Sequence, residues 1–220
     1  LYSENLGVIA VKNNLSRWYN QFFKRAFDLS VATVGTIAIS PILLGIAIAI
    51  KASSPGPAFY AHRRIGKDGI YFNCYKFRSM VVDSDRRLQE YLRANPEAAK
   101  EWEETHKLKH DPRVTKIGAF LRKTSLDELP QLFNVIRGQM SLVGPRRIVD
   151  EEVIKYDVFF SDYTMVRPGM TGLWQTSGRS DTSYSRRVRL DAWYVRNWNI
   201  WLDISLLVKT VSCLLYTSPS

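Results

Sequence analysis

The sequence contains little cysteine and little histidine. The two cysteines, Cys74 and Cys213, provide no disulfide framework and no metal-ligand spacing, so we expect them to pack inside a protein of a reducing compartment. The three histidines, His62, His106 and His110, are not spaced as metal ligands either. A disulfide-stapled scaffold and a metal centre built from cysteine and histidine are therefore excluded.

The sequence also lacks a glycine-rich phosphate loop, an internal repeat, a low-complexity tract and a linker that would separate two domains. The length of 220 residues, with 45% hydrophobic and 24% charged residues, favours one globular domain. Acidic residues are fewer than basic ones: the sequence has 21 Asp and Glu and 31 Lys and Arg, which gives a net charge of +10. This surplus favours phosphate-bearing partners, which are nucleic acids, anionic lipids or nucleotide-like substrates.

Charged side chains are absent from residues 29–50. At ~1.5 Å per residue, a helix of this length reaches about the ~30 Å of a hydrocarbon core, which predicts membrane contact. The segment is not typical of a cleavable signal peptide, since Trp18, Phe22 and Phe23 precede it and Lys51 closes it without a small-residue cleavage site.

Ser40 and Pro41 lie in the middle of this apolar segment, where proline removes a backbone hydrogen bond. Two alternatives are open, a kinked spanning helix and a re-entrant helix whose ends face the same side. We expect Ser40 or Thr36 to satisfy the freed carbonyl. Positive residues normally gather on the cytoplasmic side only, and here they occur on both flanks, which favours the re-entrant helix. They are Lys12, Arg17, Lys24, Arg25, Lys51, Arg63, Arg64 and Lys67.

Downstream, the pattern predicts a β-hairpin around the Asp68-Gly69 turn and a pair of charged surface helices over residues 81–109. For these helices the sequence gives no chemical role. The aromatic residues near the end of the chain are equally compatible with a membrane interface and with core packing. We further expect helices over 116–122, 127–137 and 190–211, and a loop-rich region with small strands over 138–175.

Two adjacent acids, Asp127 and Glu128, lie in a basic and apolar neighbourhood. They are compatible with a capping box in which Ser125 is the N-cap, or with a helix that Asp127 itself caps and that has Pro130 in its first turn. Either register places both carboxylates at the positive end of a helix. A purely structural role is therefore one alternative.

Several arginines follow the acids, and they favour a role in chemistry. Arg146 and Arg147 lie in a Gly-Pro-Arg-Arg turn, and Arg167 and Arg179 lie in later turns. Acids beside arginines suit a Mg²⁺ ion and a pyrophosphate held between them, and a carboxylate can also act as the nucleophile in phosphoryl transfer. Their position in turns near a membrane segment argues against nucleic acid.

At this point a family resemblance is clear. It is carried by Ser40-Pro41 and by "KRAFD", "YKFRSM", "SLDELPQLFNVIRGQMSLVGPR", "VRPGMTGLWQTSGR" and "LDAWYVRNW". The chain resembles the catalytic domain of bacterial sugar transferases, the monotopic polyprenyl-phosphate phosphoglycosyl transferases, from about Asn20 to Lys209. The charged insert at 81–109 is similar to that of the larger undecaprenyl-phosphate galactose and glucose phosphotransferases.

The resemblance implies a mostly helical α+β fold and a monotopic membrane protein. Its single catalytic domain would cover residues 20–212, with a broken re-entrant membrane helix at 29–50 and a cytoplasmic and interfacial part with a β-hairpin at 51–212. Residues 1–19 would be a linker from an amino-terminal region. The implied location is the cytoplasmic face of the bacterial inner membrane.

The resemblance also implies a reaction, in which a UDP-sugar, with galactose or glucose expected, gives its sugar 1-phosphate to undecaprenyl phosphate and releases UMP. This would be the first membrane step of exopolysaccharide, capsule or O-antigen synthesis. Asp127 would be the nucleophile and a Mg²⁺ ligand, and Glu128 would assist. Substrate phosphate is assigned to Arg146, Arg147, Arg78 and Arg179, and supporting roles to Asp191 and Arg167.

Arg147 departs from the family's Gly-Pro-Arg-Pro motif, so its role is open. Membrane lipids are expected partners, nucleic acid is not, and a homodimer is an open alternative. Two rival hypotheses remain: a membrane-anchored module that binds lipid phosphates without catalysis, and a phosphotransferase without a covalent intermediate. The sequence names neither the sugar nor the polymer.

Overall fold

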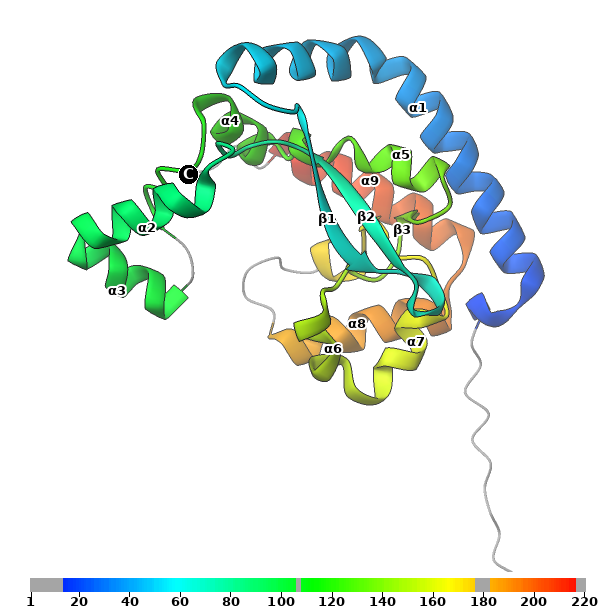
Figure 1. Ribbon diagram of the computed structural model, residues 1–220. Helices are drawn as coiled ribbons and strands as arrows, with labels where there is room; N and C mark the ends of the chain where they lie inside the picture. Colours follow the sequence, from blue (N-terminus) through cyan, green and yellow to red (C-terminus); the bar gives the residue numbers. More distant parts are fainter. Residues whose placement is uncertain (1–13, 106–107, 177–182, 217–220) are drawn as a thin grey trace, which may run out of the picture.

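The computed structural model describes residues 14–105, 108–176 and 183–216. The chain is mostly helical with two small sheets, as expected for an α+β fold (Figure 1). The helices are α1 (Trp18–Ser53), α2 (Ser84–Ala94), α3 (Pro96–Thr105), α4 (Lys116–Thr124), α5 (Gln131–Ile136), α6 (Asp150–Tyr156), α7 (Phe160–Thr164), α8 (Tyr184–Asn197) and α9 (Ile200–Tyr216). The strands are β1 (Phe59–Ile65), β2 (Tyr71–Phe77), β3 (Ser141–Val143) and β4 (Gly169–Thr171).

Helix α1 runs without interruption through Pro41 and changes direction within its apolar part (Figure 1). The helix is therefore continuous through Ser40-Pro41, where a break was expected. Proline leaves the carbonyl of Ile37 without its amide donor, and the Ser40 hydroxyl donates to that oxygen at 2.8 Å. This confirms the expectation that a nearby hydroxyl satisfies the freed carbonyl.

The apolar side chains of α1 are mostly exposed, and Val34, Ile37 and Leu44 each expose more than 60% of their surface. Among the described residues, one helix, α1, is both long enough and apolar enough to cross a membrane, judged by length and composition alone. Membrane association of this helix is therefore plausible. Whether its two ends face the same side stays a prediction.

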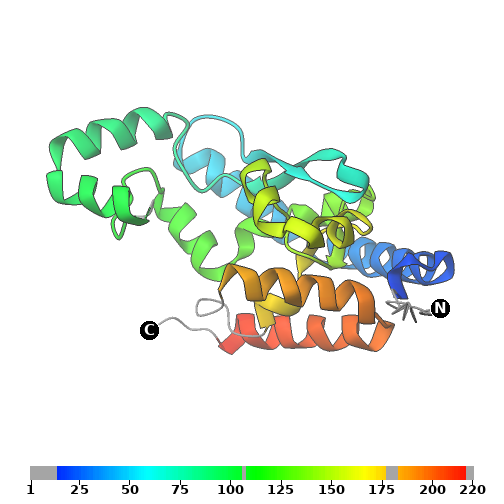
Figure 2. The same ribbon diagram turned by 90° about the horizontal axis from the view of Figure 1, so that it is seen from below.

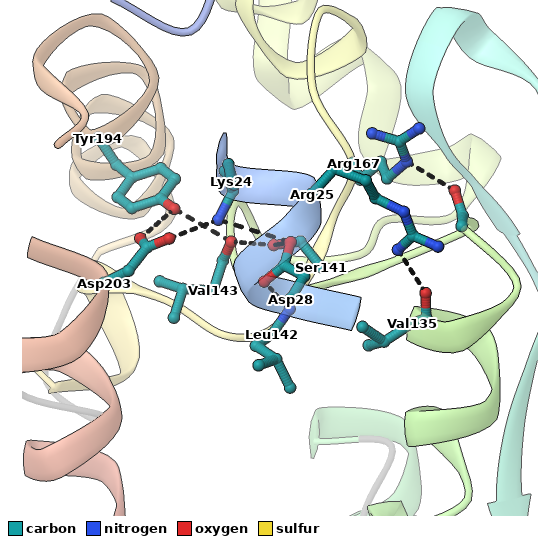
Figure 3. Close-up of polar contacts among 11 residues, drawn as sticks. Lys24, Arg25, Asp28, Val135, Ser141, Leu142, Val143, Arg167, Tyr194 and Asp203 are labelled. Carbon is teal, nitrogen blue, oxygen red and sulfur yellow. Dashed lines mark hydrogen bonds and ion pairs between the residues drawn. The ribbon is translucent and has the colours of Figure 1, made fainter. Parts of the chain in front are cut away.

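The beginning of α1 is attached to the globular part by a buried ion cluster of Lys24, Asp28 and Asp203, shown in Figure 3. The Lys24 ammonium lies 2.6 Å from a carboxylate oxygen of Asp203 on α9 and 3.9 Å from Asp28. None of the three side chains exposes more than 8% of its surface. The Tyr194 hydroxyl on α8 donates to the other oxygen of Asp203 at 2.6 Å, so the cluster joins three helices.

Asp28 extends this attachment to strand β3. It accepts hydrogen bonds from the Ser141 hydroxyl at 2.7 Å and from the Leu142 amide at 3.2 Å. One turn earlier, the Arg25 guanidinium donates to the carbonyls of Val135 and Ile136 at the end of α5 (Figure 3). The first turns of α1 thus fix β3, α5 and α9 relative to one another.

Strands β1 and β2 form the predicted antiparallel hairpin, with Phe59 opposite Phe77 and Ile65 opposite Tyr71. The turn contains Asp68 and Gly69, both with positive φ, as a tight turn of this kind requires. Helix α5 is fastened to this hairpin, because the Asn134 side chain donates to the Asn73 carbonyl and accepts from the Tyr75 amide. Cys74 is buried, as expected, whereas the side chain of Cys213 lies outside the described residues.

Helices α2 and α3 confirm the predicted pair and project from the rest of the molecule (Figures 1 and 2). The prediction of a single helix over 190–211 is wrong, because the chain forms two helices there, α8 and α9, which lie side by side in Figure 2. The helices separate at Trp198 and Asn199, and the Asn199 side chain accepts from the Leu202 amide at 2.9 Å. This asparagine cap starts a new helix where the apolar pattern alone indicated continuity.

We expect Lys24→Met to lower the free energy of unfolding by about 3–5 kcal/mol, because Asp203 and Asp28 would keep buried charges without their cation. Denaturant unfolding in detergent micelles measures the loss. Arg86→Met is the matched control, since its ion pairs with Asp83 and Glu90 are exposed and the expected change is about 0.5 kcal/mol or less. Equal stability of Lys24→Met and the native protein would contradict the role of the cluster.

Candidate active site

Asp127 and Glu128 lie in a 3-10 turn, Leu126–Glu128, between α4 and α5. Helix α4 ends at Thr124, and the φ of 57° at the next residue, Ser125, lies in the left-handed region. Helix α5 begins only at Gln131, directly after Pro130. Ser125 makes no side-chain cap, so the capping box and the helix expected from Asp127 are both wrong. The left-handed residue turns the chain sharply, and proline needs no amide partner at the start of α5.

Two cations compensate the charge of Glu128. The Lys76 ammonium on β2 lies 2.6 Å from its Oε1, and the Arg147 guanidinium forms an ion pair with the same oxygen. Asp127 has a weaker partner, since its Oδ2 lies 3.8 Å from Lys76. The side chain of Asp127 nevertheless exposes only 14% of its surface.

This asymmetry separates the pKa values of the two acids. Burial raises the pKa of Asp127, because Lys76 offsets only part of the lost hydration and the Glu128 charge acts in the same direction as burial. Burial also acts to raise the pKa of Glu128, but the ion pairs with Arg147 and Lys76 outweigh it and lower that pKa. Glu128 is therefore held ionised, whereas the charge of Asp127 is less stabilised and available for a further cation or an electrophile.

Asp127 lines a cleft of about 610 Å³ between the hairpin and the segment that follows it. The cleft is rich in basic side chains, which are His62, Arg64, Lys76, Arg78 and Arg122. Arg122 on α4 donates through Nε to the Ser79 hydroxyl at 2.8 Å. Anionic groups such as a diphosphate fit a cleft of this charge.

The predicted Gly-Pro-Arg-Arg turn brings Arg147 to the acids and directs Arg146 elsewhere. Arg147 also approaches the carbonyls of Gly169 and Met170 on β4, at 3.4 Å each. Arg146 lies over the Trp174 ring, 5.4 Å from its centroid, and 3.8 Å from Glu152. The turn therefore separates two adjacent guanidiniums that the sequence alone treats as one phosphate site.

Asp191 fixes this turn from α8. It is buried, and its Oδ2 accepts from the Arg146 amide at 3.1 Å and from the Tyr156 hydroxyl at 2.8 Å. Its Oδ1 has no hydrogen-bond partner within the described part of the chain. Burial raises the pKa of Asp191 to about 7.

The remaining predicted arginines do not all reach the acids. Arg78 lines the cleft, but its terminal nitrogens donate to the Ser54 and Pro55 carbonyls at the end of α1. Arg167 donates to the Gly138 carbonyl after α5, close to Arg25 (Figure 3). Arg179 lies outside the described residues. Phosphate binding by Arg78 and Arg179 stays a prediction.

The donor set at the acids suits a hard divalent cation. Mg²⁺ typically takes one or two carboxylates and completes its shell with water and substrate phosphates. Asp127 and Glu128 provide two carboxylates beside a cleft that could hold a diphosphate. Within residues 14–105, 108–176 and 183–216, no group of three or more His, Cys, Asp and Glu side chains could hold a metal without substrate.

A family model described as bacterial sugar transferase matches residues 19–217. The chain belongs to the bacterial sugar transferase family. This sugar transferase chain is 50% identical over 98% of its length to a UDP-galactose-lipid carrier transferase of Erwinia amylovora, and 48% identical over 98% to an undecaprenyl-phosphate galactose phosphotransferase of Salmonella typhimurium.

It spans 45% of the length of each of these two relatives. A shorter relative, the exopolysaccharide production protein ExoY of Rhizobium meliloti, is 51% identical over 86% of this sugar transferase chain and 83% of its own length. The family assignment made from the motifs is therefore confirmed.

Lys76 is a site residue of this sugar transferase that sequence reasoning missed, and so is Arg122, which lines the basic cleft. Lys76 lies within "YKFRSM", a motif that carried the resemblance but received only one assigned residue, Arg78. A lysine inside a strand is a weak signal by itself, because most such side chains are solvated. Its contact with the acids depends on how α5 packs against β2.

We expect Asp191→Asn to alter how the stability of this sugar transferase depends on pH. Because the folded-state pKa is raised, the folded protein retains a proton that the unfolded chain loses between about pH 4 and pH 7, so stability falls as pH rises through this window. The Asp191→Asn variant lacks this loss of stability. Its free energy of unfolding, relative to that of the native protein, should therefore change by up to about 4 kcal/mol between pH 4 and pH 7. Parallel curves of unfolding free energy for both proteins, measured from pH 4 to pH 8, would contradict it.

Proposed function

We propose that this chain transfers a sugar 1-phosphate from a UDP-sugar to undecaprenyl phosphate, with Asp127 as the nucleophile. The observation that carries the proposal is the position of Asp127, a partly buried carboxylate in a basic cleft whose neighbour Glu128 already has two cations. The names of the relatives, which include an undecaprenyl-phosphate galactose phosphotransferase, support the same substrates.

The proposed reaction has two balanced steps. An oxygen of Asp127 attacks the phosphorus that carries the sugar, the bond from this phosphorus to the bridging oxygen breaks, and UMP leaves. A terminal oxygen of undecaprenyl phosphate then attacks the aspartyl phosphorus, and the carboxylate of Asp127 is restored. The product is a lipid diphosphate sugar, and each step exchanges one phosphorus–oxygen bond for another.

The surrounding residues have separate roles in this proposal. Lys76 reduces the repulsion between the acids and the incoming diphosphate, because it lies close to both carboxylates. Arg147 keeps Glu128 ionised and in place. Arg122 and Arg64 provide positive charge for the substrate phosphates. A Mg²⁺ ion held by Asp127 and Glu128 would supply additional charge neutralisation.

Helix α1 would place this cleft at the membrane surface. We propose that α1 enters the bilayer, bends at Ser40-Pro41 and returns to the same face, which is the cytoplasmic face of the inner membrane. Its support is the bend, the exposed apolar side chains and the basic residues on both flanks. The acceptor's phosphate lies at this depth, so the anchor would bring a lipid and a soluble nucleotide to one cleft.

Galactose or glucose is the proposed sugar, and exopolysaccharide, capsule or O-antigen synthesis is the proposed pathway class. The names of the relatives support these proposals, since they include a galactose phosphotransferase, a glucose-1-phosphate transferase and an exopolysaccharide production protein. A homodimer remains a prediction.

We expect Asp127→Asn to abolish UMP release from UDP-galactose or UDP-glucose in the presence of Mg²⁺ and undecaprenyl phosphate, because an amide is a poor nucleophile. Mass spectrometry of the native protein with donor alone should detect a phosphosugar on Asp127. The exposed Asp157→Asn serves as the control and should retain activity. Undiminished UMP release by a folded Asp127→Asn protein would disprove the assignment.

For the membrane helix, we expect single cysteines placed before Asp28 and after Lys51 to react with an impermeant thiol reagent from the same side of sealed vesicles. The reason is that a bent, re-entrant α1 has both ends at one face. Labelling from opposite sides would show that α1 spans the bilayer.

A further inference from the structure

Glu128 borders a second cavity, of about 190 Å³, separate from the basic cleft that Asp127 lines. Two adjacent residues of one 3-10 turn thus contribute to two different hollows. The second cavity, here called the Glu128 cavity, is formed by the turn, β3, β4, the segment Leu173–Thr176 and α9. Its lining residues are Ser125, Glu128, Leu129, Leu142, Met170, Thr171, Gln175, Thr176, Leu207 and Thr210.

The chemistry of this lining differs from that of the basic cleft. Among the described residues, no lysine, arginine or histidine lines the Glu128 cavity, and Glu128 is its one charged side chain. Five uncharged polar side chains carry hydroxyl or amide groups, and four apolar side chains complete the wall. Such a lining does not suit phosphate, which prefers cations, whereas a few hydroxyl and amide groups set in a largely apolar wall suit a neutral molecule that carries hydroxyl groups.

The hydroxyls of Thr171 and Thr210 show how the wall can accept further hydrogen bonds. Their oxygens lie 2.8 Å apart, and Thr210 also donates to the Leu206 carbonyl at 2.7 Å. A hydroxyl has one proton, so Thr171 must donate to Thr210. The Thr171 oxygen retains lone pairs that can accept from a ligand hydroxyl.

Arg147 connects the cavity wall to the acid pair. It pairs with Oε1 of Glu128 and approaches the backbone carbonyls of Gly169 and Met170 on β4. The strand that carries Thr171 and the carboxylate of Glu128 are therefore held by one guanidinium, which gives the cavity a defined shape beside Glu128.

We propose that the Glu128 cavity is the hexose subsite and sets sugar preference through Gln175, Thr171 and Thr210. This inference rests on the proposed function, since the sugar must lie beside the phosphorus that Asp127 attacks. The uridine and the phosphates then remain in the basic cleft, whose volume is larger and whose positive charge suits the phosphates.

The test uses Gln175→Leu and Thr210→Val, which remove polar groups with little change in volume, and Leu207→Trp, which fills the cavity. We expect the first two to lower kcat/KM for UDP-galactose or UDP-glucose about 3- to 10-fold, as for the loss of a hydrogen bond, and to change the ratio between these two donors. The inhibition constant of UMP and the KM for undecaprenyl phosphate should stay unchanged. We expect Leu207→Trp to exclude the sugar and leave UMP binding intact.

Thr164→Val is the matched control. The Thr164 hydroxyl also donates to a carbonyl of its own helix, that of Ser161, and it lies outside the cavity. Melting temperatures verify that each variant is folded. A rise in the KM for undecaprenyl phosphate with unchanged donor kinetics would assign the cavity to the lipid and overturn the proposal, as would unchanged kinetics for both substrates.

Calorimetry in the Asp127→Asn background separates this inference from the proposed reaction, because binding needs no turnover. The probes are UDP-galactose, UDP-glucose and UMP in detergent micelles with Mg²⁺. If the native protein releases no UMP but the cavity variants weaken UDP-hexose binding and not UMP binding, the subsite stands and the proposed reaction fails. Equal UDP-hexose binding by all variants would overturn the subsite.

Discussion

The structure depends first on the buried Lys24 ammonium, which lies between the carboxylates of Asp28 and Asp203. Charges at such depth are tolerated only when paired and hydrogen-bonded, and here Tyr194 and Ser141 complete the partners of the two acids (Figure 3). This requirement fixes the start of α1 against α9 and β3. Because β3 leads directly into the Gly-Pro-Arg-Arg turn, the ion cluster also determines where Arg147 can meet Glu128.

The acid pair follows the same electrostatic rule with a different outcome. Glu128 obtains two cations and a lowered pKa, whereas Asp127 has one more distant cation and a raised pKa. The two side chains are adjacent in sequence, so the difference arises from the turn that directs one toward Arg147 and the other toward the basic cleft. In the proposed reaction, Asp127 would form its bond to phosphorus while the two ion pairs of Glu128 stay in place.

Local signals predicted the parts of the fold that depend on local physics. Asp68-Gly69 indicated the hairpin, because turn residues act through their own dihedral angles, and the predicted pair of helices divides at Asn95-Pro96 for the same physical reason. The 3-10 turn at the acids and the division between α8 and α9 were missed, since a left-handed Ser125 and a capping Asn199 are weak signals against a helical pattern. Lys76 and Lys24 find their partners 52 and 179 residues away, and no sequence period encodes such pairs.

Arg78 has a mechanical consequence. Its guanidinium binds the carbonyls of Ser54 and Pro55, where α1 ends, and it follows Lys76 by a single intervening residue, Phe77. The end of α1 is therefore hydrogen-bonded to the residue directly after β2, the strand that carries Lys76. If α1 lies in the bilayer as proposed, a change in bilayer thickness that moves this end of α1 would also move Lys76 relative to Asp127.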